Sequence, residues 1–289
     1  MKSSLYKMML RSVLVLAASA VLSACGGSDP EPLPQVGDDS GPTGSDTPVP
    51  RTLEVGNSWH WQLQGDLNTG YDVDLYDIDL FDTDTQIIDD LKAQGRVVIC
   101  YFSAGSWEDW RDDADDFEQA ALGNPLDGWP GEKWLDVRAS SLEAVMEARL
   151  DVAVEKGCDG VEPDNVDGYA NDSGFPLSGN DQLAYNRFLA SAAHERGLLI
   201  GLKNDLDQIS ELVAAFDFAV NEECYEYDEC ERLTPFIEAG KPVLHAEYAE
   251  TLVNDPEARA LFCDEMVALG FSSMVLPLEL DDSFRFVCD

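Results

Sequence analysis

The sequence of 289 residues predicts an α/β protein, namely a (β/α)8 TIM barrel with an extra N-terminal strand. Short apolar runs recur from residue 70 onward, and helical segments separate them. Several of these runs are apolar throughout, which is typical of parallel strands that helices cover on the outside. An open doubly wound sheet is the main alternative fold. It is disfavoured because no glycine-rich phosphate loop follows the first run.

Eight segments are expected to be barrel strands: residues 73–80, 96–102, 134–137, 160–164, 198–203, 216–222, 242–247 and 271–277. The extra strand is expected at residues 59–63. We place it before the barrel because the gap between it and Val73 is too short for a helix. Eight strand–helix units then fit into about 220 residues, which is ordinary for this fold.

The helices between the strands carry start and stop signals. Residues 140–143 fit a capping box, and we expect that helix to end at Gly157. Asn180 is expected to cap the following helix. Asp255 and Pro256 open the last long helix, because proline is accepted in the first turn.

Residues 1–24 have the features of a lipoprotein signal peptide. Three basic residues precede an apolar run over residues 13–22, which is too short to span ~30 Å of hydrocarbon as a transmembrane helix. Residues 22–25, Leu-Ser-Ala-Cys, resemble a bacterial lipobox. The resemblance implies that Cys25 is the lipidated first residue of the mature protein. Gly26 after it implies export to the outer membrane, at its periplasmic face or at the cell surface.

Residues 25–52 are expected to be a flexible acidic linker, and residues 53–289 to be the barrel domain. The linker is rich in glycine, serine and proline, and it has too few large apolar side chains to bury a core. It would hold the domain away from the membrane, so we expect membrane contact only through the lipid anchor.

The charge of the chain excludes several partners. There are 57 acidic residues against 18 Lys and Arg, which gives a formal net charge of -39. Such a surface repels nucleic acid and anionic lipid headgroups. Two causes of the acidity compete: general solvation in salty surroundings, and attraction of a cationic polymer to acids gathered at the strand ends.

Six cysteines remain besides Cys25, and the oxidising compartment that an exported protein meets favours disulfides. Short spacing favours a Cys224–Cys230 bridge, and a Cys263–Cys288 bridge would attach the C-terminus to the last helix. Cys100 and Cys158 form either a third bridge or two buried free thiols. With three histidines and no zinc-like spacing, we expect no metal and no cofactor.

Acidic residues stand at most of the predicted strand ends, where a TIM barrel places its chemistry. Alternation along a strand puts Glu162 and Asp164 on one face, with Asp164 nearer the mouth. The same rule brings Glu222 to the mouth, where it would face Asp164 with one strand between them. Paired carboxyl groups in a cleft perform glycoside hydrolysis, because one attacks or stabilises the sugar while the other donates a proton. Any single acid can also simply be solvated or cap a helix.

Other residues at the mouth are expected to bind substrate: Asp77, Asp79, Tyr101, Asn165, Asp167, Lys203, Asn221, Glu247 and Tyr248. The acids suit sugar hydroxyls or an ammonium group, and the aromatic rings suit sugar faces or cations, with core packing as the alternative. Lys203 either holds a catalytic carboxylate ionised or pairs with Asp205 in a structural salt bridge.

Several of these segments resemble motifs of glycoside hydrolase family 114, in the same order: residues 59–63, 76–82, 98–105, 157–165, 202–204 and 221–224. The resemblance runs from about residue 57 to the C-terminus. It implies a TIM barrel that cleaves α-1,4-linked galactosaminans in an endo manner. It also implies that Asp164 is the nucleophile or base and Glu222 the proton donor. Glu223 and Glu247 stay open as alternatives for the donor.

The leading hypothesis is therefore a monomeric, outer-membrane-tethered glycoside hydrolase that acts on galactosamine-containing polysaccharide. The alternative is a non-catalytic lipoprotein that binds a cationic polysaccharide in a cleft at the barrel mouth. A metal-assisted hydrolase is a third, weaker possibility, because the acids lack histidine ligands at suitable spacing. The sequence leaves a retaining or inverting mechanism open, although we favour retention.

Overall fold

The computed structural model describes residues 52–288. The predicted signal peptide, Cys25 and nearly all of the predicted linker lie outside these residues, and so those predictions are untested. No helix in the described part of the chain is long and apolar enough to cross a membrane.

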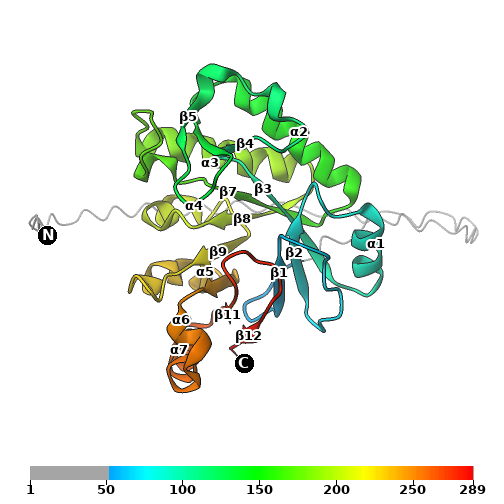
Figure 1. Cartoon of the computed structure of the whole chain (residues 1–289), viewed down its shortest axis with the longest axis vertical. Coiled ribbons are helices and arrows are strands. Elements are labelled where there is room, and N and C mark those ends of the chain that lie inside the picture. The colour runs from blue at the N-terminus through cyan, green and yellow to red at the C-terminus, as the bar shows by residue number, and fades with distance from the viewer. Residues whose placement is uncertain (1–51, 289) are drawn as a thin grey trace, which may run out of the picture. The chain divides into compact units, whose positions relative to one another are not determined.

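One curled sheet forms the centre of the molecule, with the strand order β1-β2-β3-β7-β8-β9-β10-β11-β12 (Figure 1). Its strands are β1 (Trp59–Gln62), β2 (Leu75–Asp79), β3 (Val97–Ser103), β7 (Gly160–Asp164), β8 (Leu199–Lys203), β9 (Phe218–Glu222), β10 (Val243–Glu247), β11 (Ser272–Val275) and β12 (Phe286–Val287). The first eight run parallel, and β12 pairs antiparallel with β11. The TIM-barrel-like class predicted from the sequence is confirmed.

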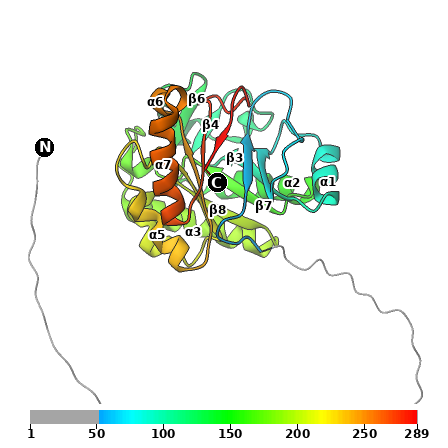
Figure 2. The ribbon, with the colours of Figure 1, turned by 90° about the horizontal axis from the view of Figure 1, so that it is seen from below.

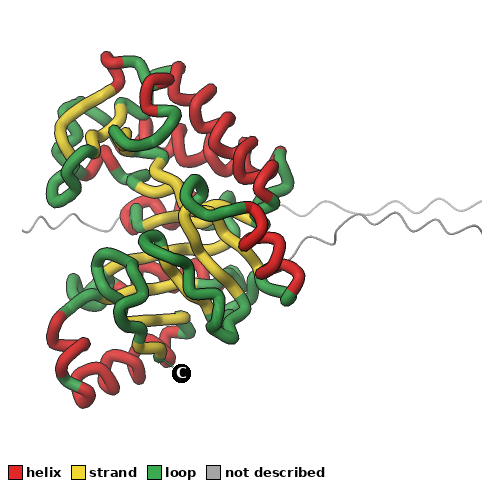
Figure 3. The backbone as a smooth tube through the Cα atoms, turned by 45° about the vertical axis from the view of Figure 1, so that its right-hand side comes forward, coloured by secondary structure: helices red, strands yellow, loops and turns green. Residues whose placement is uncertain are grey.

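Helices surround this sheet on the outside (Figures 2 and 3). They are α1 (Thr85–Ala93), α2 (Ser141–Lys156), α3 (Gly179–Glu195), α4 (Ile209–Leu212), α5 (Thr234–Glu238), α6 (Glu250–Asn254) and α7 (Pro256–Leu269). Gly157 ends α2 in the left-handed conformation, as predicted. Asp255 caps α7, also as predicted, but Ser178 rather than Asn180 caps α3, in a capping box with Asp181.

The two ends of the sheet contact each other, although no ladder among the described residues pairs β1 with β11 or β12. The Trp59 indole N–H on β1 donates to the Ser272 carbonyl on β11 over 2.9 Å. Beyond β11, the Arg285 guanidinium donates to the Trp59 carbonyl over 2.6 Å, and the Leu63 N–H donates to the Leu280 carbonyl over 3.0 Å. The C-terminal segment therefore seals the seam that β1 would otherwise leave open.

Side-chain alternation separates two apolar clusters. Trp59, Leu75, Ile99 and Phe218 belong to the cluster that fills the barrel. Their strand neighbours, such as Tyr76, face the larger cluster between the sheet and the helices. Residues two positions apart therefore share a face, and this alternation decides which strand-end side chains reach the barrel mouth.

Two features of the predicted strand order are corrected. Residues 134–137 are not a barrel strand. They overlap β6 (Glu132–Leu135), the centre of a separate antiparallel sheet with β4 (Ser106–Glu108) and β5 (Leu122–Pro125). The expected N-terminal strand β1 is present, and it is one of the eight parallel strands in place of residues 134–137. A short apolar run does not specify its pairing partner, which is why the sequence pattern misplaced β6.

All three proposed disulfides are present: Cys100–Cys158, Cys224–Cys230 and Cys263–Cys288. The first joins β3 to the turn before β7, so the alternative of two free thiols is wrong. The third attaches α7 to the C-terminal segment that closes the barrel, as the sequence suggested.

Candidate active site

Lys203 stands at the centre of the barrel mouth, at the end of β8, with a side chain only 2% exposed. Its Nζ lies 3.2 Å from Glu162 Oε1, 3.1 Å from Asp164 Oδ1 and 3.2 Å from Glu222 Oε2. Burial by itself would lower the pKa of this ammonium. The nearby Asp164, Glu222 and Glu162 outweigh that effect and raise the pKa well above its usual value. Lys203 therefore stays charged and ties two strand ends together.

Asp164 ends β7 and receives several donors. The Tyr101 hydroxyl donates to Oδ2 over 3.1 Å, and the Asn165 N–H donates to Oδ1 over 2.6 Å. Together with Lys203, these donors hold the Asp164 side chain in place at the cleft. A carboxylate held in this way suits a nucleophile or a base.

Glu222 ends β9 on the other side of Lys203. It accepts hydrogen bonds from the Tyr248 hydroxyl over 2.6 Å and from the Asn204 amide over 3.2 Å. Burial would raise the pKa of Glu222, but Lys203, Tyr248 and Asn204 together lower it. In the empty cleft Glu222 is therefore ionised, and it must take up a proton before it can act as an acid.

Glu223 follows directly and also lines the cleft. Burial and the neighbouring Glu222 raise its pKa, which is the direction that a proton donor needs. The structure thus keeps two of the three donor candidates, Glu222 and Glu223, beside the cleft. The third, Glu247, lies elsewhere.

Glu247, Asn221 and Asp77 do not line the cleft, although the sequence prediction put them there. Alternation turns Asn221 and Glu247 to the outer face of the sheet, where Glu247 accepts from the Tyr225 N–H and pairs with His245. Asp77 faces inward but is completely buried below the mouth. The expectation of direct substrate contact is corrected for these three residues.

The remaining predicted residues all line one cleft of about 1210 Å³: Asp79, Tyr101, Asp164, Asn165, Asp167, Lys203, Glu222 and Tyr248. Asp79 is not available to a ligand as a free acid, because the Arg111 guanidinium binds both of its oxygens over 3.0 and 2.7 Å. Burial and Asp164 raise the pKa of Asp167 to about 6.

The sequence reasoning missed one wall of this cleft. The β4–β5–β6 sheet and its loops contribute Trp110 and Trp129, which are 52% and 40% exposed. The acidic residues Asp127 and Asp172 line the same cleft. No local pattern marks these side chains, because they reach the barrel mouth only through the insertion between β3 and α2.

A polar chain also supports the Asp164 loop from below. The Asn165 amide donates to Ser103 Oγ over 2.9 Å, and Ser103 contacts Ser106 Oγ at 2.7 Å. Ser106 in turn donates to Glu132 over 2.6 Å. Asn165 itself has a φ of 60°, a strained conformation that this hydrogen bonding holds in place.

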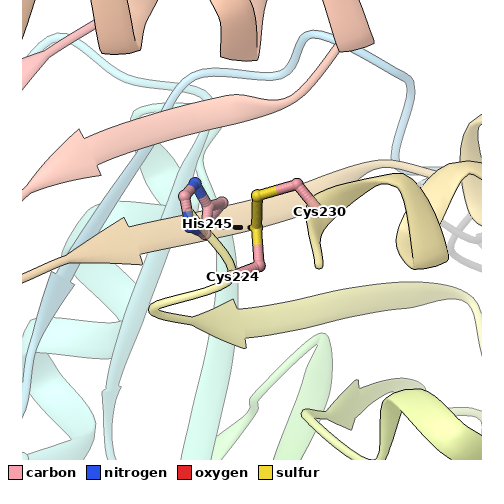
Figure 4. A group of neighbouring side chains, drawn as sticks. All are labelled: Cys224, Cys230 and His245. Atoms are coloured by element: carbon pink, nitrogen blue, oxygen red, sulfur yellow. Dashed lines mark hydrogen bonds between the residues drawn. A yellow bond between two sulfur atoms is a disulfide. The ribbon is translucent and has the colours of Figure 1, made fainter. Parts of the chain in front are cut away.

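Among the described residues, one group could hold a metal ion by geometry: Cys224, Cys230 and His245, whose ligand atoms lie within 4.8 Å of one another (Figure 4). The two sulfur atoms are bonded to each other, so they are not thiolate ligands. His245 Nε2 lies 3.3 Å from Cys224 Sγ and 3.0 Å from Glu247 Oε1. We infer that this group stabilises the conformation of the segment that follows Glu222.

Asp164 and Glu222 thus lie on either side of one lysine, in an open cleft at the strand ends. Such a pair of carboxyl groups is typical of enzymes that hydrolyse glycosidic bonds. The profile of glycoside-hydrolase family GH114 matches residues 41–289, and the chain belongs to this family. The protein is therefore a glycoside hydrolase.

Among solved structures, Ega3 of Aspergillus fumigatus in complex with galactosamine is 42% identical, with a TM-score of 0.78 over 85% of this chain and 100% of that one. The glycoside hydrolase domain of PelA from Pseudomonas aeruginosa shares the fold, at 17% identity and a TM-score of 0.62 over 78% of this chain and 96% of that domain. An uncharacterized protein of Deinococcus radiodurans is 28% identical over 65% of this chain and 67% of its own length.

Proposed function

We propose that the protein hydrolyses α-1,4-galactosaminidic bonds within a galactosamine-containing polysaccharide, with Asp164 and Glu222 as the reacting carboxyl groups. The observation that carries this proposal is their shared contact with Lys203 at the floor of an acidic cleft. The 42% identity to a relative that binds galactosamine supports the choice of sugar.

The charge of the cleft favours an amino sugar. Eleven acidic residues line it against two basic ones, Lys203 and Arg111, and both of these are already paired with carboxylates. The field of the unpaired acids attracts ammonium groups along a partly deacetylated chain. The exposed rings of Trp110 and Trp129 add surfaces on which sugar faces or cations stack.

The expected test is the hydrolysis of partly deacetylated polygalactosamine by Asp164→Asn, Glu222→Gln and Glu223→Gln. The first two variants should each lose at least about 10³-fold in kcat, because the amide can neither attack nor transfer a proton. Glu223→Gln, the matched control, should lose less than about 10-fold. The measurement is the release of reducing ends, followed by mass analysis of products.

Unchanged hydrolysis in both Asp164→Asn and Glu222→Gln would contradict the assignment. If Glu223→Gln is inactive and Glu222→Gln is active, Glu223 is the proton donor, and the proposed function is unaffected. Tight polymer binding by the wild type with no bond cleavage would instead favour the alternative, a non-catalytic polysaccharide-binding lipoprotein.

The spacing of the two carboxyl groups favours retention at the anomeric carbon. Asp164 Oδ1 and Glu222 Oε2 each lie within 3.2 Å of Lys203 Nζ. These two oxygens are therefore at most about 6.4 Å apart, which is compatible with the roughly 5–5.5 Å between the carboxyl groups of retaining enzymes. The first product seen by NMR during hydrolysis should be the α-anomer, and an initial β-anomer would contradict a double displacement.

The protein is further proposed to be exported and attached to the outer membrane through lipid on Cys25. This proposal rests on the basic start, apolar run and Leu-Ser-Ala-Cys ending of residues 1–25. Expressed in a bacterial host, the full chain should incorporate labelled palmitate, and Cys25→Ser should abolish the label. Label retained in Cys25→Ser would contradict lipidation at this position.

A further inference from the structure

Asp77 and Glu162 form a buried acidic pair directly below the proposed catalytic carboxyl groups. Both side chains point into the barrel, and both residues are 0% exposed. No N–H or O–H group in the described part of the chain donates a well-formed hydrogen bond to any of their four oxygens, although the Ile78 N–H approaches Asp77. Below them the barrel is filled by apolar side chains such as Phe218. Two full charges are costly in such a place.

Asp77 and Glu162 are buried side by side in the barrel, and each acts on the charge of the other. Two ionised carboxylates buried together would repel each other with one ammonium, Lys203, beside them, and this favours a proton on one of the two. Burial raises the pKa of Asp77 to about 7, and burial together with Asp77 raises the pKa of Glu162 well above its usual value. The electrostatics and the geometry agree that the pair retains a proton at neutral pH.

The pair reaches the reaction through Lys203. Glu162 Oε1 lies 3.2 Å from Lys203 Nζ, the same atom that contacts Asp164 and Glu222. Any further negative charge on the pair would compete with the two catalytic carboxylates for one ammonium. The charge state of Asp77 and Glu162 therefore affects how strongly Lys203 stabilises the negative charges of Asp164 and Glu222.

Within the described part of the chain, Lys203 is the cation that acts on the pair. The titratable or charged groups that act on it are Lys203 on β8, Asp164 on β7, Tyr101 on β3 and, after β10, Tyr248. Glu222 on β9 contacts Lys203. Asp79, two positions beyond Asp77 on β2, is neutralised by Arg111 at 2.7 Å. Trp61 from β1 presents a ring 4.9 Å from Lys203 Nζ.

We propose that Asp77 and Glu162 share one proton throughout the reaction and act as a positioning pair, which holds Lys203 in place and leaves its charge to Asp164 and Glu222. Neither residue touches substrate, so the pair is not catalytic in the sense of Asp164. This inference rests on the proposed function only where it concerns activity, because the shared proton itself is a property of the folded protein.

Infrared difference spectroscopy tests the proton without any substrate. At about pH 9 most other buried acids are ionised, since burial raises the pKa of Glu132 to about 7 and that of Asp205 to about 8. The wild type should still show a protonated-carboxyl band that shifts in D2O. The double variant Asp77→Asn/Glu162→Gln should lose this band, and Asp205→Asn should keep it.

A wild type without the band, or a double variant that keeps it, would overturn the shared proton. Because this readout needs no catalysis, it stands or falls separately from the galactosaminidase assignment. Thermal unfolding of each variant establishes that it is folded. If the double variant does not fold, Asp77→Asn and Glu162→Gln are measured singly, and the band must change in both.

The pH dependence of kcat/KM tests the link to Lys203. Either single amide reproduces the pair with its proton fixed on one side, so the acidic limb of the profile should not move. The double variant also removes the remaining negative charge, and the limb should shift by about one unit toward lower pH. A single variant that shifts as far as the double variant, or a double variant that does not shift, would overturn the proposal.

Discussion

Lys203→Met should reduce kcat/KM by about 10³-fold, which corresponds to about 4 kcal/mol of transition-state stabilisation. The reason is that the Lys203 ammonium, which is 2% exposed, contacts both Asp164 and Glu222. It positions both side chains and offsets their negative charge. Lys203 is also a main cause of the lowered pKa of Glu222. The residual activity should therefore have its optimum at higher pH than that of the wild type.

The same variant should lose about 3–5 kcal/mol of stability at neutral pH, because it leaves buried carboxylates without a cation. Urea unfolding measures this loss, and it should diminish toward acidic pH as the carboxylates protonate. Lys241→Met is the matched control, since its Nζ donates to the Val213 and Phe216 carbonyls, neither of which lines the cleft. Near-wild-type activity in Lys203→Met would contradict the central role of the lysine.

Gly105→Ala should inactivate the enzyme almost as fully as Asp164→Asn. A Cβ at position 105 would lie 1.7 Å from the Asn165 carbonyl oxygen, and backbone cannot move aside as a flexible side chain can. The Gly105 N–H also donates to the Asp164 carbonyl over 3.0 Å. The added methyl group must push the two loops apart at the catalytic carboxylate.

The expected loss of stability in Gly105→Ala is about 1–3 kcal/mol, so the variant should remain folded while its kcat falls. Gly179→Ala is the control, because its Cβ would meet side chains alone, the Gln208 amide at 3.1 Å and the Tyr169 ring at 3.7 Å. Chemical denaturation and kinetics measured on both variants separate the two effects. A Gly105→Ala enzyme with unchanged kcat would show that the Asp164 loop tolerates displacement.

The fold was largely predictable, because it depends on local patterns. Continuous apolar runs and helix signals determine most of the strands and helices, and the period of two puts Asp164 on the inner face of β7. Pairing partners are not local. Residues 134–137 look like a short barrel strand, yet Trp134 and Leu135 belong to β6, which pairs antiparallel with β4 and β5.

The candidate site was predictable for the strands whose ends were placed correctly. Asp164, Lys203 and Glu222 alternate inward on three successive strands, and they meet as expected. Alternation alone does not say which of two faces is the inner one. Packing made that choice for β10, where Leu244 fills the barrel and Glu247 turns outward.

The sequence by itself determined the acidity of the chain, the class of the fold, the three disulfide pairs as candidates and the two carboxyl groups that we propose to react. Each of these follows from composition or from neighbours along the chain. Only the tertiary structure decided that one lysine serves both carboxylates, and that Asp77 and Glu162 meet below it. Such contacts join residues from different strands, and their charge states depend on burial, which no local sequence pattern encodes.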